Sequence, residues 1–454
     1  AILSTSMNAI IFMDKRNDEG DIYLQLISSG GTLSGGNILL NTDNSSVPQS
    51  EPSLAVSDTA ILTVWNDTRS VIGMTGQRIF GKYLDYNGVS ISGEFVISDS
   101  SNINIKSQPQ VTLLPNNTAL VVWQEITGGM PMVLGRFLNP DGTFLSSIFT
   151  ISNDANDIGN DDINLSVSPG NIFVIGWIAR DAAGGPMAVV ARYNASGAFI
   201  NRFTYTSPIG GVDISDIAIA IDNSEHIYLL WEGSDSRLYF SRCSSTGLID
   251  INGSMIEDVS SADFEPAITV DSDGNMILCY IRTSANIRRL YYQVFNTSLN
   301  AFLKSYASPL VVPFMGSPSI AVANHDLYFV WVDPREDGMN IYSASITYTP
   351  SAMDDDKNIV IPDNFSLEQN FPNPFNPSTT IRFNLPHLSK VNLSIYNLLG
   401  EKVMTLIDRE MTAGVHSISW NGEDENGIKI GSGIYFYRLN SGQYEQSRKM
   451  ILLK

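Results

Sequence analysis

The hydrophobic pattern of this chain is a series of short apolar segments, each ending in a large aromatic residue and followed by a polar turn. Residues Ile61–Trp65, followed by Asn66 and Asp67, are one example. This unit recurs every 49 to 58 residues. A repeat of about fifty residues built from short strands is typical of β-propellers. We therefore predict a seven-bladed β-propeller whose blade anchors are Phe12, Trp65, Trp123, Trp177, Trp231, Tyr280 and Trp331.

Each repeat can be divided into four strands. In the second repeat these are Ser53–Val56, Ile61–Trp65, Gln77–Leu84 and Glu94–Ser98, because alternation and β-branched or aromatic residues indicate strand. Turns rich in Asn, Asp and Gly, such as Asp85–Gly88, join the third strand to the fourth. Helical periodicity is nearly absent, which makes this an all-β chain. Prolines precede several inner strands, where a missing N–H costs least: Pro52, Pro109, Pro266 and Pro318.

The repeat also predicts how the ring closes. Ala1–Ser4 aligns with the inner strands, and Asn358–Ile361 lies where other repeats have their fourth strand. We therefore expect seven blades complete in sequence, closed by packing without exchange of a terminal strand. Alternatively, the segment ending at Pro362 leads into the next domain, and the seventh sheet keeps an open edge. The predicted domains are 1–362, with a linker or last outer strand at 349–362, and 363–454.

After Pro362 the fifty-residue period stops and a second pattern begins. A proline-stiffened entry is followed by about seven short strands with a turn signal every dozen residues. This pattern predicts a small immunoglobulin-like β-sandwich. Its expected strands are Ile381–Phe383, Lys390–Tyr396, Lys402–Ile407, Gly414–Trp420, Ile428–Ile430, Gly433–Leu439 and Glu445–Leu453.

Several motifs of this C-terminal segment occur in a fixed order along its full length. They run from Gln369–Pro377 through Ile395–Gly400 and the Trp420 region to Lys449–Lys454. On these motifs the segment resembles the C-terminal sorting domain of type IX secretion cargo. The residues that carry the resemblance are Gln369, Asn370, Pro372, Asn373, Pro374, Phe375, Asn376, Pro377, Tyr396, Gly400, Trp420, Gly433, Tyr435, Lys449 and Lys454.

The resemblance implies an exported protein. It implies passage across the outer membrane with this domain as the address, the type IX secretion machinery as partner, and an extracellular or outer-surface location. Such domains are usually removed afterwards, although domains of this kind also serve as assembly modules. The preceding repeats look like the propellers of such secreted proteins.

The charge and the composition argue against some classes of function. With 27 Lys and Arg against 47 Asp and Glu, the net charge is −20, which argues against nucleic acid. No apolar run is long enough for a transmembrane helix. A start at Ala1 fits a chain whose export signal has been removed. Cys243 and Cys279 are the two cysteines. Their pattern favours buried thiols over a disulfide, and both states remain open.

The most conspicuous candidate chemistry is an acid two residues after the anchor aromatic. A carboxylate cluster on one face of the ring could bind a cation or perform acid–base work. Three of these acids are followed by an arginine at the same offset, and catalytic groups are normally single. We therefore interpret Asp-x-Arg as a pair that braces the turn. The acids are Asp14, Asp67, Glu125 and Asp333, and the arginines are Arg16, Arg69 and Arg335.

Metal binding has two weak candidates. Asp271 and Asp273 begin a sequence like a calcium loop, but the later ligands that such loops need are missing. Turn chemistry explains these residues as well. Asp157 and Asp161 lie in an acidic run that suits a cation by charge density, as it would suit a solvated loop. Calcium is the ion these side chains fit, and no other cofactor is expected.

Motifs of known enzyme classes are missing. No Gly-x-Ser-x-Gly elbow, sialidase box or metal-ligand spacing of histidines occurs. A carboxylate pair for glycoside hydrolysis would be assembled by the fold alone, so the sequence is silent on it. The leading hypothesis is a non-enzymatic structural protein of the cell surface or medium that self-associates into filaments or layers. The alternative is a glycan-binding adhesin or a propeller-type carbohydrate-active enzyme.

Overall fold

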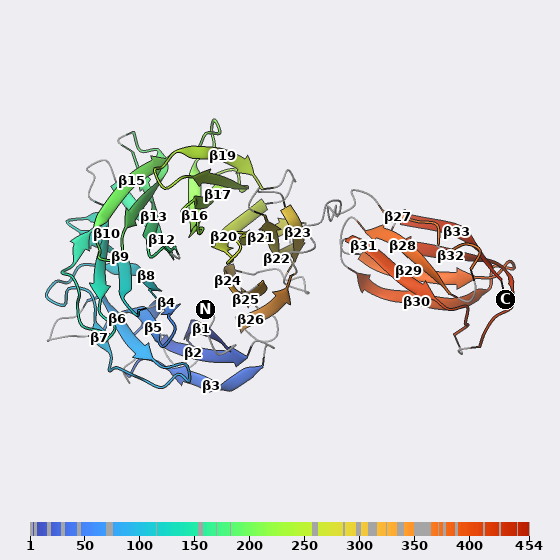
Figure 1. Cartoon of the computed structure of the whole chain (residues 1–454), viewed down its shortest axis with the longest axis horizontal. Coiled ribbons are helices and arrows are strands. Elements are labelled where there is room, and N and C mark those ends of the chain that lie inside the picture. The colour runs from blue at the N-terminus through green and yellow to red at the C-terminus, as the bar shows by residue number, and fades with distance from the viewer. Residues whose placement is uncertain are drawn as a thin grey trace. The chain divides into compact units, whose positions relative to one another are not determined.

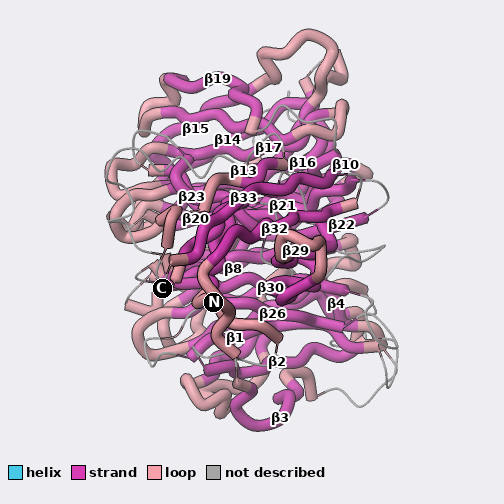
Figure 2. Tube along the Cα trace, turned by 90° about the vertical axis from the view of Figure 1, so that its right-hand side faces the viewer, coloured by secondary structure: helices cyan, strands magenta, loops and turns pink. Residues whose placement is uncertain are grey.

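The computed structural model consists of strands and loops, and none of the residues it describes is helical (Figure 2). It therefore contains no helix, in the described part, that could span a membrane. The described residues are 3, 7–15, 20–28, 32–42, 47–69, 76–114, 116–152, 158–168, 170–181, 183–256, 262–284, 287–296, 301–306, 316–323, 325–333, 340–348, 365–370, 372–375, 378–385, 389–411, 414–425, 428–442 and 444–453.

The chain divides into two compact units, residues 1–350 and residues 351–454. The expected boundary at 362/363 falls in the segment 349–364, which lies outside the described residues. That boundary therefore stays a prediction.

In the first unit, seven antiparallel sheets of consecutive strands follow one another among the described residues (Figure 1). The first three sheets are β1 (Met7–Asp14), β2 (Asp21–Ser28), β3 (Leu33–Leu39); β4 (Gln49–Val56), β5 (Ile61–Asp67), β6 (Arg78–Leu84), β7 (Phe95–Val96); and β8 (Lys106–Leu113), β9 (Ala119–Thr127), β10 (Met130–Leu138), β11 (Phe149–Thr150). The next two are β12 (Ile158–Val167), β13 (Phe173–Arg180), β14 (Pro186–Tyr193), β15 (Phe199–Tyr205); and β16 (Ile214–Ile221), β17 (Ile227–Gly233), β18 (Leu238–Cys243), β19 (Ile249–Met255). The last two are β20 (Ala262–Val270), β21 (Met276–Ser284), β22 (Ile287–Phe295), β23 (Ala301–Tyr306); and β24 (Gly316–Ala323), β25 (Asp326–Asp333), β26 (Asn340–Thr347).

These sheets stand around a ring, with β4, β8, β12, β16, β20 and β24 nearest its centre (Figure 1). Each sheet is apolar on both faces, so it buries them against the sheets before and after it. Leu62 of β5, for example, shares a hydrophobic cluster with Val121 of β9. Val122 of β9 in turn shares a cluster with Ile175 of β13. The core is therefore a ring of sheet-to-sheet junctions.

Six of the seven predicted anchors lie on the second strand of their sheet, whereas Phe12 lies on β1, the first described strand of its sheet. Trp65, Trp123, Trp177, Trp231 and Tyr280 are 0% exposed and Trp331 is 2% exposed. Phe12 differs because it is half-buried, and it stacks on Tyr23 with ring centroids 5.9 Å apart.

The inner strands begin earlier than the sequence indicates. Pro52, Pro109, Pro266 and Pro318 were expected before the strands, but they lie inside β4, β8, β20 and β24, at interruptions of the strand register. A β-bulge leaves one residue unpaired, so a proline there removes no ladder hydrogen bond. The prolines therefore mark bulges.

The second unit contains two antiparallel sheets around a single core. One has the order β27-β28-β31 and the other β30-β29-β32-β33. Phe383, Leu393, Trp420 and Leu439 are among the buried residues between them. The expected strand at Ile428–Ile430 is wrong, because the structure has only an isolated bridge there. The strands are β27 (Ser366–Leu367), β28 (Thr379–Leu385), β29 (Ser389–Tyr396), β30 (Lys402–Met411), β31 (Gly414–Trp420), β32 (Gly433–Ser441) and β33 (Tyr444–Leu452).

The first and seventh sheets each have three strands in the described part of the chain. The strand expected at Asn358–Ile361 lies outside the described residues, as does Ala1–Ser4 apart from Leu3. Ring closure by complete blades therefore stays a prediction.

We expect Trp231→Ala to destabilise the first unit strongly. Trp231 stacks on Tyr239 at 4.5 Å and is fully buried, so its removal should cost about 3–5 kcal/mol. Phe12→Ala should cost clearly less, because Phe12 is half-buried. Urea unfolding followed by circular dichroism measures both. Equal losses for the two variants would contradict the assignment of Trp231 as a core anchor.

Candidate functional site

The motif at the start of the second unit is fastened through a buried asparagine. The backbone N–H of Asn370 donates to the Tyr437 hydroxyl at 2.8 Å, and that hydroxyl donates to the Glu368 carbonyl at 2.7 Å. The Asn370 side chain, 2% exposed, donates to Thr379 Oγ1 at 2.9 Å. These bonds hold the turn against β32 and β28. The asparagine therefore has a structural role in shaping the turn.

The same motif is joined to the last strand, β33. Asn373 Oδ1 accepts the Ile451 N–H at 2.9 Å, and Gln369 Nε2 donates to the Lys449 carbonyl at 2.8 Å. Phe375 exchanges backbone hydrogen bonds with Ile451 and Leu453. Its ring is buried and packs on Trp420 at 5.7 Å. Motif residues at the two ends of the segment are thus neighbours in space, whereas Asn376, Pro377 and Lys454 lie outside the described residues.

The remaining motif residues have distinct positions. Gly400 has φ +80° and ends the turn after Tyr396, a conformation that favours glycine. Tyr435 donates its hydroxyl to the Gly431 carbonyl at 2.9 Å and meets Trp420 edge-on. Gly433 begins β32. These residues therefore shape the turns and the core of the sandwich.

In the first unit, the acid two residues after an anchor accepts the hydrogen bond of the buried indole. Trp65 Nε1 donates to Asp67 Oδ2 at 3.2 Å, and Trp123 Nε1 donates to Glu125 Oε2 at 3.3 Å. Trp177 has Ala179 at that offset, and its buried N–H has no partner among the described residues. The acid therefore satisfies a buried donor, which would otherwise cost free energy.

Asp67 also holds the turn that follows. Arg69 Nε donates to Asp67 Oδ2 at 2.8 Å, and its guanidinium reaches Glu94 at 2.7 Å. Arg69 lies 4.2 Å from the centre of the Phe80 ring. This is the geometry of a turn brace. Arg16 and Arg335 lie outside the described residues, as does the side chain of Asp333, and Asp14 is half-buried in β1.

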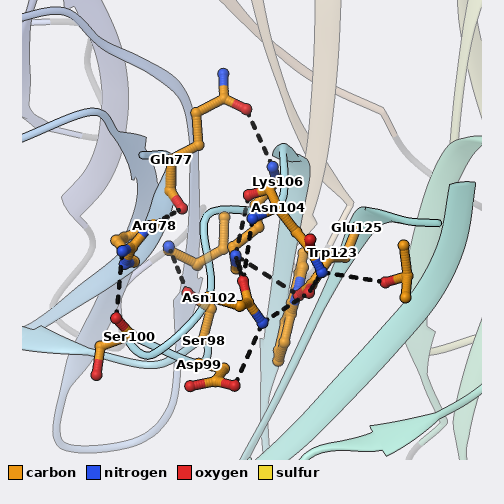
Figure 3. Close-up of polar contacts among 12 residues, drawn as sticks. Gln77, Arg78, Ser98, Asp99, Ser100, Asn102, Asn104, Lys106, Trp123 and Glu125 are labelled. Carbon is orange, nitrogen blue, oxygen red and sulfur yellow. Dashed lines mark hydrogen bonds and ion pairs between the residues drawn. The ribbon is translucent and has the colours of Figure 1, made fainter. Parts of the chain in front are cut away.

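A buried lysine marks the junction of the second and third sheets (Figure 3). Lys106 Nζ donates to Asn102 Oδ1 at 2.6 Å and to the Asn104 carbonyl at 3.0 Å, and lies 3.9 Å from Glu125 Oε2. Burial lowers the pKa of Lys106, while Glu125 opposes that shift. An ammonium has three donors; two hydrogen bonds are formed here, and the Glu125 carboxylate lies at ion-pair distance. Lys106 is therefore a structural cation rather than a free nucleophile.

The inner-strand bulges form a chain of hydrogen bonds from sheet to sheet. The Gln108 N–H donates to Glu51 Oε2 at 2.6 Å, and the Ile163 N–H donates to Gln108 Oε1 at 3.2 Å. The Ile217 N–H donates to Asp162 Oδ2 at 2.6 Å. Glu51, Gln108 and Asp162 all have φ +52°, which is uncommon for residues other than glycine. The left-handed bulge directs each side chain to the next sheet.

Several carboxyl groups lie close together where this series of hydrogen bonds reaches the fourth, fifth and sixth sheets. Burial raises the pKa of both Asp162 and Asp216, and a side-chain hydrogen bond between the two raises the pKa of Asp162 further. Burial, Asp216 and Glu265 together raise the pKa of Glu232 to about 7. These three carboxyl groups therefore keep their protons to a higher pH than free carboxyl groups do.

The predicted metal candidates occupy different places. Asp271 and Asp273 lie in the turn between β20 and β21, and His325 of the seventh sheet brings its ring within 4.8 Å of their oxygens. Asp271 already accepts hydrogen bonds from the N–H groups of Asp273 and Asn275, at 2.9 and 2.7 Å. Asp161 accepts a hydrogen bond from Gln108.

Asp157 lies outside the described residues. The structure thus keeps Asp161 apart from the Asp271–Asp273 pair, and it adds His325, which the sequence analysis did not connect with that turn. A cation at this turn would have to displace some of the hydrogen bonds of Asp271.

A cavity of about 270 Å³ lies between the first and seventh sheets. Asn8 and Ile10 of β1 line one side, and Ser319, Tyr328 and Ser343 line the other. The lining contains no Asp, Glu, Lys or Arg among the described residues.

Cys243 and Cys279 are both buried and unbonded. Burial raises the pKa of both thiols. The structure therefore agrees with the interpretation of buried apolar residues and gives no disulfide.

Residues 369–453 match the family described as secretion system C-terminal sorting domain. The match confirms the resemblance found in the sequence motifs. No curated protein matches the chain.

Solved structures with a similar fold are distant in sequence. A polysaccharide lyase of family PL25, an ulvan lyase, has a TM-score of 0.52 at 9% identity, covering 77% of this chain and 93% of the lyase. A protein of unknown function from Dyadobacter fermentans has a TM-score of 0.48 at 9% identity, covering 66% and 95%. The β-propeller domain of the Trilobed protease from Pyrococcus furiosus has a TM-score of 0.45 at 8% identity, covering 75% and 92%. The likeness to the lyase shows a shared fold and, at 9% identity, nothing of activity.

We expect stability to fall as the pH rises from 4.5 to about 7. The pKa of Glu232 rises from 4.5 to about 7 on folding. Between these values the folded chain therefore binds more protons than the unfolded chain, and unfolding becomes easier with rising pH. Glu232→Gln should reduce the loss of melting temperature between pH 5 and pH 8 by several degrees. Asp58→Asn, on an exposed turn, is the charge-matched control and should behave as wild type. An unchanged pH profile for Glu232→Gln would contradict the assignment.

We expect Tyr437→Phe to weaken the second unit by about 1–3 kcal/mol, because it leaves the buried Asn370 N–H without an acceptor. Tyr435→Phe removes a hydroxyl that bonds a carbonyl at the surface and should cost clearly less. Amide hydrogen exchange of Asn370 in the full chain distinguishes them. Equal protection of Asn370 in the two variants would refute this role of Tyr437.

Proposed function

Because residues 369–453 are a secretion sorting domain, which places the protein on the cell surface or outside the cell, we propose a non-enzymatic structural or assembly role there. In this proposal the first unit is a seven-bladed β-propeller, and the second is an immunoglobulin-like module joined to it near residue 362. The type IX secretion machinery is the partner during export. Afterwards the protein associates with copies of itself or with other surface proteins.

The observation that carries this proposal is that the candidate acids accept hydrogen bonds from other groups of the first unit. Asp67 and Glu125 accept hydrogen bonds from buried indoles. Asp162 binds the backbone of the next sheet. A catalytic carboxylate needs an oxygen that can reach substrate, whereas these are engaged with the protein. Their repetition around the ring supports a structural role.

The spacing of the most perturbed pair also favours this proposal over glycoside hydrolysis. Asp162 and Asp216 are directly hydrogen-bonded. Retaining hydrolases place their two carboxyl groups about 5–5.5 Å apart, and inverting hydrolases place them farther apart. A directly bonded pair leaves no room for a glycosidic bond between the groups.

A glycan-binding role is the second candidate, and the cavity between the first and seventh sheets favours it. Its lining is uncharged in the described residues and carries several hydroxyl groups. Pockets of this kind accept small neutral ligands through a few polar contacts. Calcium at Asp271, Asp273 and His325 is a further proposal, and it is compatible with either role.

The proposal predicts that the protein keeps its C-terminal unit and assembles. We expect the intact mass of protein recovered from the native cell surface or medium to correspond to the full chain, and negative-stain images to show fibres or sheets. A mass lacking the residues beyond about 363, with dispersed particles, would contradict the assembly role and leave the propeller as the working part.

The enzymatic alternative is tested on the same material. The full chain and the Asp162→Asn variant are incubated with neutral and acidic polysaccharides, and new reducing ends are measured. We expect none with either protein. Release of reducing ends by wild type that is lost in Asp162→Asn would overturn the non-enzymatic proposal.

A further inference from the structure

The face of the seventh sheet that turns toward the first sheet is made of small and hydroxyl-bearing residues. Cross-strand pairing places Ser319, Val330 and Ser343 in one row. It places Ala321, Tyr328 and Ser345 in the next row. All six line the cavity. Their strand neighbours Ile320, Phe329 and Ala344 belong to the core shared with the sixth sheet, and they also border the cavity.

The sixth sheet has larger residues at the matching places. There Tyr292 pairs with Cys279, and Val294 pairs with Ile277. In the seventh sheet the equivalent pairs are Ser343 with Val330 and Ser345 with Tyr328. Tyr292 fills its junction, with its ring 5.0 Å from Phe329. Two serines at the equivalent positions leave that volume empty at the junction of the seventh and first sheets. The cavity thus arises from specific small residues.

The opposite wall contributes a buried amide with an unused acceptor. Asn8 pairs with Ile27 and lines the cavity. It is 8% exposed, and its amide hydrogen-bonds the Tyr328 hydroxyl. Asn8 Oδ1 accepts no hydrogen bond from the part of the chain that the structure describes. A buried polar atom without a partner is costly, so a ligand hydroxyl that donates to Oδ1 would remove that cost.

The chemistry of the lining specifies the ligand class. The serine and tyrosine hydroxyls can donate and accept, the Asn8 oxygen accepts, and Ile10, Ile27 and Val330 add apolar surface. No charged side chain from the described residues lines the cavity to hold an ion. A ring with hydroxyl groups on its edge and C–H groups on its face matches both kinds of surface. We infer that the cavity between the first and seventh sheets is a binding site for one neutral sugar unit.

This inference makes the second candidate function specific and rests on it, and it is compatible with the assembly role. A sugar unit held between the two sheets would contact both ends of the ring, because β1 and β24–β26 belong to the first and last sheets. Binding should therefore stabilise the ring as well as attach it to a glycan.

The direct test uses the full chain with methyl glycosides of glucose, galactose, mannose and N-acetylglucosamine. Saturation-transfer NMR detects binding, and the melting temperature reports stabilisation. We expect at least one glycoside to bind with a dissociation constant in the millimolar range and to raise the melting temperature. If none of the four binds, the inference is overturned.

The site is tested by filling the cavity. The double variant Ser343→Tyr and Ser345→Val introduces the residues that the sixth sheet uses at the same positions. We expect affinity to fall at least tenfold, with a melting temperature equal to or above that of wild type, because cavity filling adds packing. Ile341→Tyr places a tyrosine on the same strand at a residue that does not line the cavity, and it should bind as wild type.

Should the double variant not fold, Asn8→Leu serves as the second variant. It removes the unpartnered oxygen at similar volume, so we expect at least a fivefold loss of affinity in a folded protein. If glycosides still bind after the cavity-filling change, or after Asn8→Leu, the glycan site lies elsewhere. The inference would then fail while the glycan-binding candidate stood. Enzymatic release of sugars, by contrast, would overturn the non-enzymatic proposal and leave the cavity inference intact.

Discussion

The structure depends on one constraint, which is that no sheet of the first unit can bury both of its faces alone. Each sheet is apolar on two sides and must pack between two others. The anchors Trp65, Trp123, Trp177 and Trp231 lie on the second strand of their sheets and are fully buried. Sheets therefore follow each other around a ring until the last meets the first, and the repeat of about fifty residues is the length of chain that builds one such sheet.

Buried polar groups of the first unit form hydrogen bonds within a sheet or with the following sheet. A buried indole N–H needs an acceptor, and Asp67 or Glu125 supplies one from the same strand. The inner strands bulge, and Glu51, Gln108 and Asp162 then reach the backbone of the following sheet. Several acidic side chains of the ring thus accept hydrogen bonds that hold a strand or join two sheets. The raised pKa values of Asp162 and Asp216 follow from placing two half-buried carboxyls together at a junction between sheets.

The junction of the last and first sheets is made differently. Elsewhere large side chains such as Tyr292 fill the space between sheets. Here Ser343, Ser345 and Asn8 line an open volume. A ring whose chain ends meet at one junction has no covalent connection across it, so this place can differ in packing from the others. In the second unit, by contrast, both ends of the sorting domain are joined, because Asn373 and Phe375 bond to the last strand.

The sequence by itself determined the all-β class, the strand-by-strand repeat, the sorting domain and the burial of the aromatic anchors other than Phe12. All of these depend on residues close together in the chain, where alternation and turn residues act directly. Only the tertiary structure decided which side chains meet across sheets. Pro52 and Pro109 did not reveal that Glu51 and Gln108 would be linked, nor did Asp271 and Asp273 reveal His325 as a neighbour. The cavity behind Asn8 was equally hidden, since its walls come from opposite ends of a 350-residue unit. Distances between such residues depend on ring packing, and no local pattern in the sequence encodes them.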